Sequence, residues 1–308
     1  MNIIFMGSAA FAVPALEALV KSHHDILEIV AQPDKPAGRG MQIRACPTAE
    51  FAKERGIPLY QPEGVRKPEV LRHFLKLAAD LIVIIAYGRM LPRELIDMPP
   101  HGTINVHASL LPKYRGAAPI NWAIVNGERE TGVTTMFINE EMDAGDILLE
   151  AKTPIGESET APELHDRLAR MGADLLKATI RELEEGKLTP TPQDHRKATQ
   201  APIIKKEDGL IDWSLTARAI FNRVRGFTPW PGAYTNLGDK TLRIHSAEMT
   251  EDERKAAPGT VIEAQDRLCI ACGEGILKLV EVQLQGGKRM PAANFLRGHK
   301  LSAGERLG

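Results

Sequence analysis

The sequence predicts an α/β protein in which a doubly wound, mainly parallel sheet precedes a small OB-like β-barrel. Three observations lead to this prediction. Apolar, strand-like runs alternate with helical segments over residues 1–189. Periodicity then fails across residues 190–207, where prolines interrupt the chain. Within residues 208–308, five short strand-like runs are separated by turn residues. We therefore expect a sheet domain, a linker and a barrel domain with these limits.

Composition places the chain among ordinary two-domain globular proteins. It has 308 residues, of which 43% are apolar and 26% charged, and its formal net charge is −1. Three cysteines indicate a reducing compartment, and the longest apolar run is far too short to span a bilayer. No secretory leader is apparent. We expect a cytoplasmic protein without membrane contact.

The charge is unevenly distributed along the chain. From His195 onward there are 18 Lys and Arg residues against 13 Asp and Glu residues. A basic C-terminal half points weakly to a polyanionic partner. A surface that merely leans basic explains the count equally well.

The chain opens with a strand at residues 2–6, a glycine turn and a helix to residue 20. This is how nucleotide-binding sheets begin, but Gly7 stands alone and no Walker lysine follows. NAD or ATP binding therefore has little support. A second strand covers residues 27–31. The remaining elements expected in the first domain are helices at 47–55, 68–79, 117–125 and 161–185 and strands at 80–86, 103–106, 132–138 and 147–151.

Between the second strand and the next helix lies a basic loop, residues 32–44. It is broken by proline and glycine and carries Lys35, Arg39 and Arg44. Loops of this length are usually functional or mobile, and these side chains suit phosphate contacts. A solvated loop without a ligand is an equal alternative. In the second domain we expect a helix at 215–225 and strands at 232–236, 241–247, 260–264, 268–271 and 276–283.

The predicted strand at 103–106 carries the most informative polar residues. Asn105 and His107 are two positions apart, so they point to the same side of the sheet just before a loop. Either alone could be a satisfied core group, but the pair favours a site. Such groups can donate hydrogen bonds to a carbonyl oxygen that becomes negative during attack.

Asp143, in the acidic loop 139–146, could tune the imidazole and accept a proton. Its alternative role is a turn-forming residue before Gly145. Ser109 lacks the context of a nucleophile elbow, so direct transfer between two bound substrates is favoured over an acyl-enzyme.

These residues carry a resemblance. The run Asn-Val-His-x-Ser-Leu-Leu-Pro at 105–112, the following Arg115-Gly116 and Met-Asp-Ala-Gly-Asp at 142–146 resemble the 10-formyltetrahydrofolate-dependent formyltransferases. Segments 32–40, 114–120, 206–213 and 229–232 are similar to the branch that acts on methionyl-tRNA, and the match runs nearly end to end. The chain departs from the pattern at residues 8–10, Ser-Ala-Ala, and at Ala144.

The resemblance implies a Rossmann-like domain that binds 10-formyltetrahydrofolate as co-substrate and a barrel that binds tRNA. The amine of initiator methionyl-tRNA would attack the formyl carbon directly, giving N-formylmethionyl-tRNA through a tetrahedral intermediate. Asn105 and His107 would stabilise the oxyanion, and Asp143 would assist proton removal. A monomer without metal is expected. The folate contacts implied are Tyr87, Gly88, Arg89, Met90, Leu91, Ser109, Leu110, Leu111 and Pro112, and the tRNA contacts are Lys35, Arg39 and Arg44.

Three alternatives remain open. A formyltransferase acting on an amino sugar nucleotide would share the same three catalytic residues. So would the formyl-hydrolysing module of a folate dehydrogenase. A noncatalytic RNA-binding protein would use the basic loop and barrel but would not depend on His107.

Overall fold

The structure is a computed structural model that describes residues 1–37 and 42–308. The chain forms two compact units, and it passes from one to the other more than once. The predicted domain limits are not tested by this division and stay predictions. The first unit comprises Met1–Pro119, Glu130–Thr153 and His165–Ala201, and the second comprises Ile120–Arg129, Pro154–Leu164 and Pro202–Gly308.

A seven-stranded sheet forms the centre of the first unit, in the order β10-β9-β7-β6-β1-β2-β5. Four neighbouring pairs are parallel, whereas β9 runs antiparallel to β7. Strands such as β6 are buried on both faces, which is why they read as unbroken apolar runs. The predicted mainly parallel sheet is confirmed. Its strands are β1 Asn2–Gly7, β2 Asp25–Val30, β5 Leu59–Tyr60, β6 Leu81–Ile85, β7 Thr103–His107, β9 Glu130–Phe137 and β10 Ile147–Pro154.

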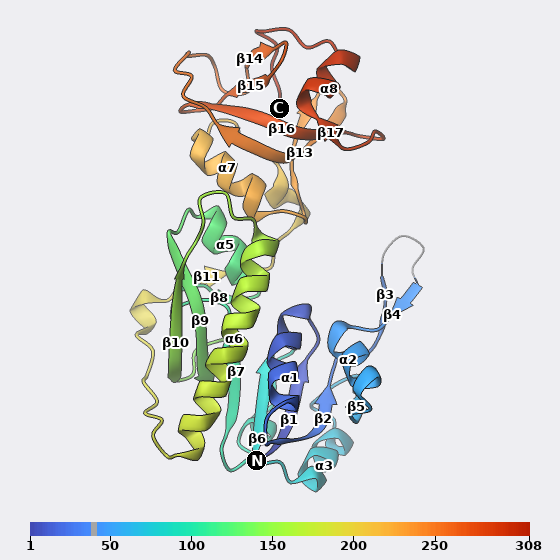
Figure 1. Cartoon of the computed structure of the whole chain (residues 1–308), viewed down its shortest axis with the longest axis vertical. Coiled ribbons are helices and arrows are strands. Elements are labelled where there is room, and N and C mark those ends of the chain that lie inside the picture. The colour runs from blue at the N-terminus through green and yellow to red at the C-terminus, as the bar shows by residue number, and fades with distance from the viewer. Residues whose placement is uncertain (38–41) are drawn as a thin grey trace. The chain divides into compact units, whose positions relative to one another are not determined.

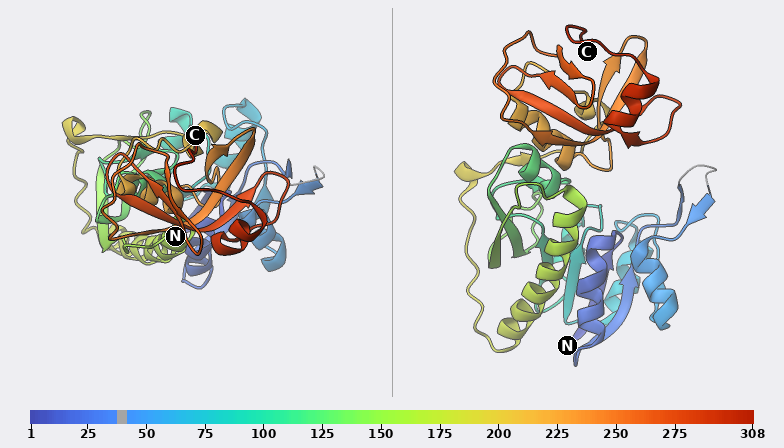
Figure 2. Two further views of the ribbon diagram at one scale, coloured as in Figure 1. Left: turned by 90° about the horizontal axis from the view of Figure 1, so that it is seen from above. Right: turned by 45° about the horizontal axis from the view of Figure 1, so that its top comes forward.

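Helices cover this sheet. α1 and α6 run along one face (Figures 1 and 2), and α6 approaches so closely that a Cβ added to Gly172 would lie 3.1 Å from Val106 of β7. α3 packs through Val70 and Phe74 against Ile4 and Ile82. Within the described residues, no helix combines the length and apolar composition needed to traverse a bilayer. The helices of the first unit are α1 Val13–Val20 (after the 3-10 turn Ala10–Ala12), α2 Pro47–Arg55, α3 Pro68–Leu77, α4 Arg93–Ile96 and most of α6 Ala161–Glu184. Apart from its first residue, α5 Pro119–Val125 belongs to the second unit.

The segment predicted as an irregular loop, residues 32–44, contains two short strands. β3 (Lys35–Ala37) and β4 (Gln42–Arg44) pair antiparallel, so that Lys35 lies opposite Arg44. The prediction was wrong here because pairing across the ribbon satisfies backbone groups that a sequence pattern broken by proline does not reveal. Arg39 lies outside the described residues.

The chain after α6 is also more ordered than a simple linker. A 3-10 turn spans His195–Lys197, and β11 (Gln200–Ala201) pairs in parallel with β8 (Arg115–Gly116). Three prolines between residues 190 and 202 hide this order from a periodicity analysis, because the backbone contacts are long-range. A further 3-10 turn spans Lys206–Gly209.

The second unit is built on an antiparallel sheet in the order β12-β13-β16-β15-β14, with β17 added to β16. All five predicted strands are present and pair antiparallel, whereas β17 and α8 were not predicted. The described ladders form an open path, with no ladder joining β12 to β14. Its elements are α7 Ala217–Gly226, β12 Ala233–Leu237, β13 Lys240–Met249, β14 Val261–Ala264, β15 Leu268–Ala271, β16 Ile276–Leu284, β17 Met290–Pro291 and α8 Ala292–Gly298.

Candidate functional site

Strand β7 delivers Asn105 and His107 to one face of the sheet. Val106 between them faces α6, so its two neighbours project from the opposite face. Both are buried, with exposed fractions of 9% and 6%. The carboxamide of Asn105 forms no hydrogen bond with any other residue that the structure describes, so it can bond to a bound molecule.

Two acceptors face the ring of His107. Its Nε2 donates to the carbonyl oxygen of Tyr114 at 2.9 Å, and its Nδ1 lies 3.6 Å from Oδ2 of Asp143. A neutral imidazole donates from one nitrogen only, whereas an imidazolium can donate to both neighbours. The bond to Tyr114 engages Nε2 and leaves Nδ1 as the nitrogen that faces the carboxylate.

Asp143 lies beside His107 because the chain turns back after β9. β9 is antiparallel to β7, and Ile138, just beyond it, bonds to Thr103 at the start of β7. The acidic loop then folds back toward the other end of β7. The Asp143 carboxylate accepts a hydrogen bond from the backbone of Gly116 at 2.8 Å, far along the chain. The Asx-type bond in this loop belongs instead to Asn139, whose Oδ1 accepts from the backbone of Glu141.

Gln193 was not anticipated from the sequence. Its amide nitrogen donates to the carbonyl oxygens of Asp143 and Gly145 at 2.9 and 2.7 Å. Its amide oxygen accepts from Nη2 and Nε of Arg115 at 2.6 and 3.1 Å. No local pattern marks this glutamine, because it stands in a proline-broken stretch and its partners are long-range.

The loop after β6 holds the first set of predicted folate contacts. Gln32 donates to the carbonyl of Tyr87 at 2.7 Å, and positive φ angles of 48° and 78° at Ala86 and Gly88 turn the chain sharply. The Tyr87 phenol is buried and has no hydrogen-bond partner among the described residues. Burial raises the pKa of Tyr87 above its ordinary value. Leu91 is buried and Met90 is exposed.

The second predicted folate set follows β7 and is mostly internal. Ser109 is fully buried, and its hydroxyl donates to the carbonyl of Lys113 at 2.7 Å. Thr134 links the carbonyl of Ser109 to the backbone NH of Leu111. Leu111 is buried, while Leu110 and Pro112 are half-buried. Ser109 therefore shapes the turn that presents the residues after it.

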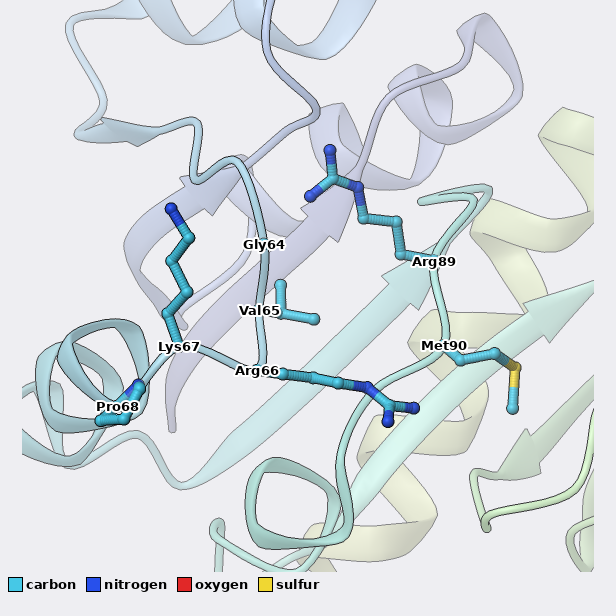
Figure 3. Close-up of a pocket in the computed structure, with 7 residues that line it drawn as sticks. All are labelled: Gly64, Val65, Arg66, Lys67, Pro68, Arg89 and Met90. Carbon is cyan, nitrogen blue, oxygen red and sulfur yellow. The ribbon is translucent and has the colours of Figure 1, made fainter.

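A cationic cavity of about 480 Å³ lies beside the loop after β6. Its walls come from the segment that leads into α3 and from that loop (Figure 3). Arg66 is exposed and forms no hydrogen bond or ion pair with another described residue, Lys67 pairs with Glu63 at 3.0 Å, and Arg89 donates to backbone carbonyls. The sequence analysis missed Arg66 and Lys67. The lining residues are Gly64, Val65, Arg66, Lys67, Pro68, Arg89 and Met90.

Two further features of the first unit are the basic end of β4 and a cluster of possible metal ligands. Of the predicted tRNA contacts, Arg44 is exposed at the end of β4 and Lys35 pairs with it through the backbone. Among the described residues, metal-ligand atoms gather at His23, His24 and Glu184, within 4.8 Å of one another. This group precedes β2 and so lies at the opposite end of the parallel strands from His107.

Family models and related sequences show which family the chain belongs to. A family model described as formyl transferase matches residues 1–180, and its C-terminal domain model matches residues 203–300. The chain belongs to the formyl transferase family. The resemblance seen in the motifs is confirmed.

Relatives in this family align over the whole chain. A methionyl-tRNA formyltransferase of Citrifermentans bemidjiense is 49% identical, covering 100% of this chain and 96% of that protein. One from Solibacter usitatus is also 49% identical, covering 100% and 99%.

Solved structures share the fold. The N-formyltransferase of Helicobacter canadensis, in complex with folinic acid and dTDP-3-aminofucose, has a TM-score of 0.67 at 18% identity and covers 94% of this chain and 99% of that one. HypX of Aquifex aeolicus, in complex with tetrahydrofolic acid, has a TM-score of 0.61 at 21% identity and covers 96% and 47%.

Proposed function

We propose that this formyl transferase moves the formyl group of 10-formyltetrahydrofolate to the amino group of initiator methionyl-tRNA. Full-length relatives with that name at 49% identity support the choice of acceptor. The observation that carries the chemistry is the approach of His107 to Asp143, 3.6 Å apart, next to an Asn105 amide with no described partner. A site of this kind can stabilise an oxyanion and take up a proton.

The reaction joins the amine nitrogen to the formyl carbon. As the C–N bond forms, the carbonyl electron pair moves to oxygen and gives a tetrahedral oxyanion. Asp143 takes the proton that the attacking nitrogen must lose. Collapse of the intermediate breaks the bond to N10 of the folate, which leaves as tetrahydrofolate after taking up the proton that Asp143 accepted. Atoms and charge then balance, and no covalent enzyme intermediate is required.

Asn105 and His107 have distinct parts in this scheme. Asn105 donates from its carboxamide to the developing oxyanion. His107 keeps Nε2 bonded to the carbonyl of Tyr114, and in its doubly protonated form it donates from Nδ1 toward the reacting groups and Asp143. Both donors are buried in a water-poor setting, where such hydrogen bonds contribute more than they do in water.

Folate is proposed to lie along the loop after β6 and the turn after β7. The two carboxylates of its glutamate end suit the cavity formed around Arg66, Lys67 and Arg89. Its ring system then points toward Leu91, Leu111 and the end of β7. The buried hydroxyl of Tyr87 is an unused hydrogen-bonding group in the same region.

The tRNA is proposed to bind through the basic segment 32–44, which carries Lys35, Arg39 and Arg44, and through the second unit. Several cations of the second unit are neutralised locally, as in the ion pairs Arg267–Glu263 and Lys278–Glu248. The Lys and Arg residues of the second unit outside such ion pairs supply the positive surface for the phosphates of the tRNA.

One assay tests the proposal. Purified protein is incubated with 10-formyltetrahydrofolate and aminoacylated initiator tRNA, with an amino sugar nucleotide as control acceptor. We expect formyl transfer to the tRNA and none to the sugar. Transfer to the sugar alone would replace the proposed acceptor, and formate release without either acceptor would indicate the hydrolase.

A further inference from the structure

A strained backbone supports the Asp143 carboxylate. Asp143 has φ of 50°, the left-handed region that is unfavourable for a residue with a Cβ. The loop that carries it must also return from the far end of β7. Such a conformation persists only where surrounding contacts over-determine it.

Gln193 supplies contacts of the required kind. Its amide nitrogen bonds to the backbone carbonyl of the strained residue, Asp143, and to that of Gly145. Gln193 is itself buried, with an exposed fraction of 6%. Arg115 holds its amide oxygen with two donors. The Gln193 carboxamide therefore directs its amide nitrogen at the loop and cannot turn around without losing the bonds to Arg115.

Arg115 connects Gln193 to the other proposed catalytic groups. Its neighbours in sequence bond to both members of the pair, Tyr114 to His107 through its carbonyl and Gly116 to Asp143 through its NH. β8 is fixed in turn by pairing with β11. Gly116 has no room for a side chain, since an added Cβ would lie 2.7 Å from the carbonyl oxygen of Ala201.

We propose that Gln193, oriented by Arg115, is a positioning residue that keeps the Asp143 carboxylate facing His107 during formyl transfer. The inference rests on the proposed function, because it assigns Gln193 a role through Asp143. Gln193 itself touches neither substrate. It acts by holding the two backbone carbonyls that set the direction of the Asp143 side chain.

The test is a double-mutant cycle with Gln193→Met and Asp143→Asn. We expect Gln193→Met to lower kcat by about tenfold to hundredfold, the size of effect caused by misplacing a reacting group. The KM values for both substrates stay within about twofold, because the substrate contacts are intact. In the Asp143→Asn background, the same change has almost no further effect.

Two companion variants isolate the cause. Gln193→Glu keeps an acceptor for Arg115 and converts this contact to an ion pair, but it lacks both amide hydrogens, so kcat falls as in Gln193→Met. Gln200→Met alters an exposed glutamine of the same segment whose side chain makes no hydrogen bond to described residues, and it leaves kcat unchanged. Thermal unfolding of each variant is measured in parallel.

The outcomes separate cleanly. Equal losses from Gln193→Met in both backgrounds would show general disruption and overturn the positioning role. Full activity of Gln193→Glu would do the same, because the donors would then be dispensable. A wild-type protein that does not formylate methionyl-tRNA would instead overturn the proposed function itself.

Discussion

The reaction centre and the cationic cavity belong to the same unit, yet they are built in opposite ways. At the end of β7, Asn105 and His107 are buried and Asp143 is half-buried, and His107 and Asp143 are hydrogen-bonded to the backbone. Around Arg66 and Arg89 the cations are exposed or half-exposed. The two regions therefore suit different tasks. Groups held in fixed positions can stabilise a transition state, whereas accessible charges can attract an anionic ligand.

The largest effect is expected from the enclosed site. His107→Ala removes a donor and the partner of Asp143, so kcat for formyl transfer falls by about a thousandfold. The dissociation constant for tRNA stays nearly unchanged, because the tRNA contacts lie elsewhere. Steady-state kinetics and filter binding measure the two quantities. Undiminished transfer would favour the noncatalytic RNA-binding alternative.

Salt distinguishes charge attraction from fixed geometry. Raising the salt concentration from 50 to 200 mM should raise KM for tRNA by about tenfold, even if only two phosphates are contacted. KM for the folate should rise less, and kcat should hardly change, because buried hydrogen bonds are poorly screened. Initial rates over a salt series test this. Equal sensitivity for both substrates would contradict a separate phosphate-binding surface.

A single cation of the cavity is expected to have a smaller effect. Arg66→Ala should raise KM for 10-formyltetrahydrofolate by about fivefold, because one solvent-screened contact to a carboxylate is lost. Its kcat should be that of the wild type, as for loss of uniform binding. The matched control is Arg72→Ala, because Arg72 is an exposed arginine on α3 that does not line the cavity. A fall in kcat with unchanged KM would place Arg66 in the reaction centre instead.

The smallest effect concerns a buried group without a partner. Tyr87→Phe removes a hydroxyl that forms no hydrogen bond among the described residues, so the free energy of unfolding should rise by up to about 1 kcal/mol. Chemical denaturation measures it. A loss of stability would reveal an interaction of the phenol that the structure does not show.

Local sequence rules point to two of the three proposed catalytic residues. Asn105 and His107 are predicted by period-two alternation in a short strand. Strand β6 is likewise predicted by an unbroken apolar run. The pairing of Asp143 with His107 was reached only as one of several possibilities, because it depends on a loop that returns past an antiparallel strand.

Other features escaped because their causes are not local. Gln193 sits among prolines, and nothing near it in sequence indicates its bonds to Asp143 and Arg115. Arg66 and Lys67 look like ordinary surface cations until the loop after β6 is placed beside them. The strands β3 and β4 likewise form only by pairing with each other.

The parallel pairing of β8 with β11 has a practical consequence for dissecting this enzyme. A fragment ending near residue 189 would keep every strand of the large sheet but discard Gln193 and the backbone that flanks Gly116. Such a truncation would remove the hydrogen bonds from Gln193 that hold the backbone of Asp143 and Gly145. The proposed catalytic carboxylate therefore depends on a segment that follows the last strand of the sheet by about 40 residues.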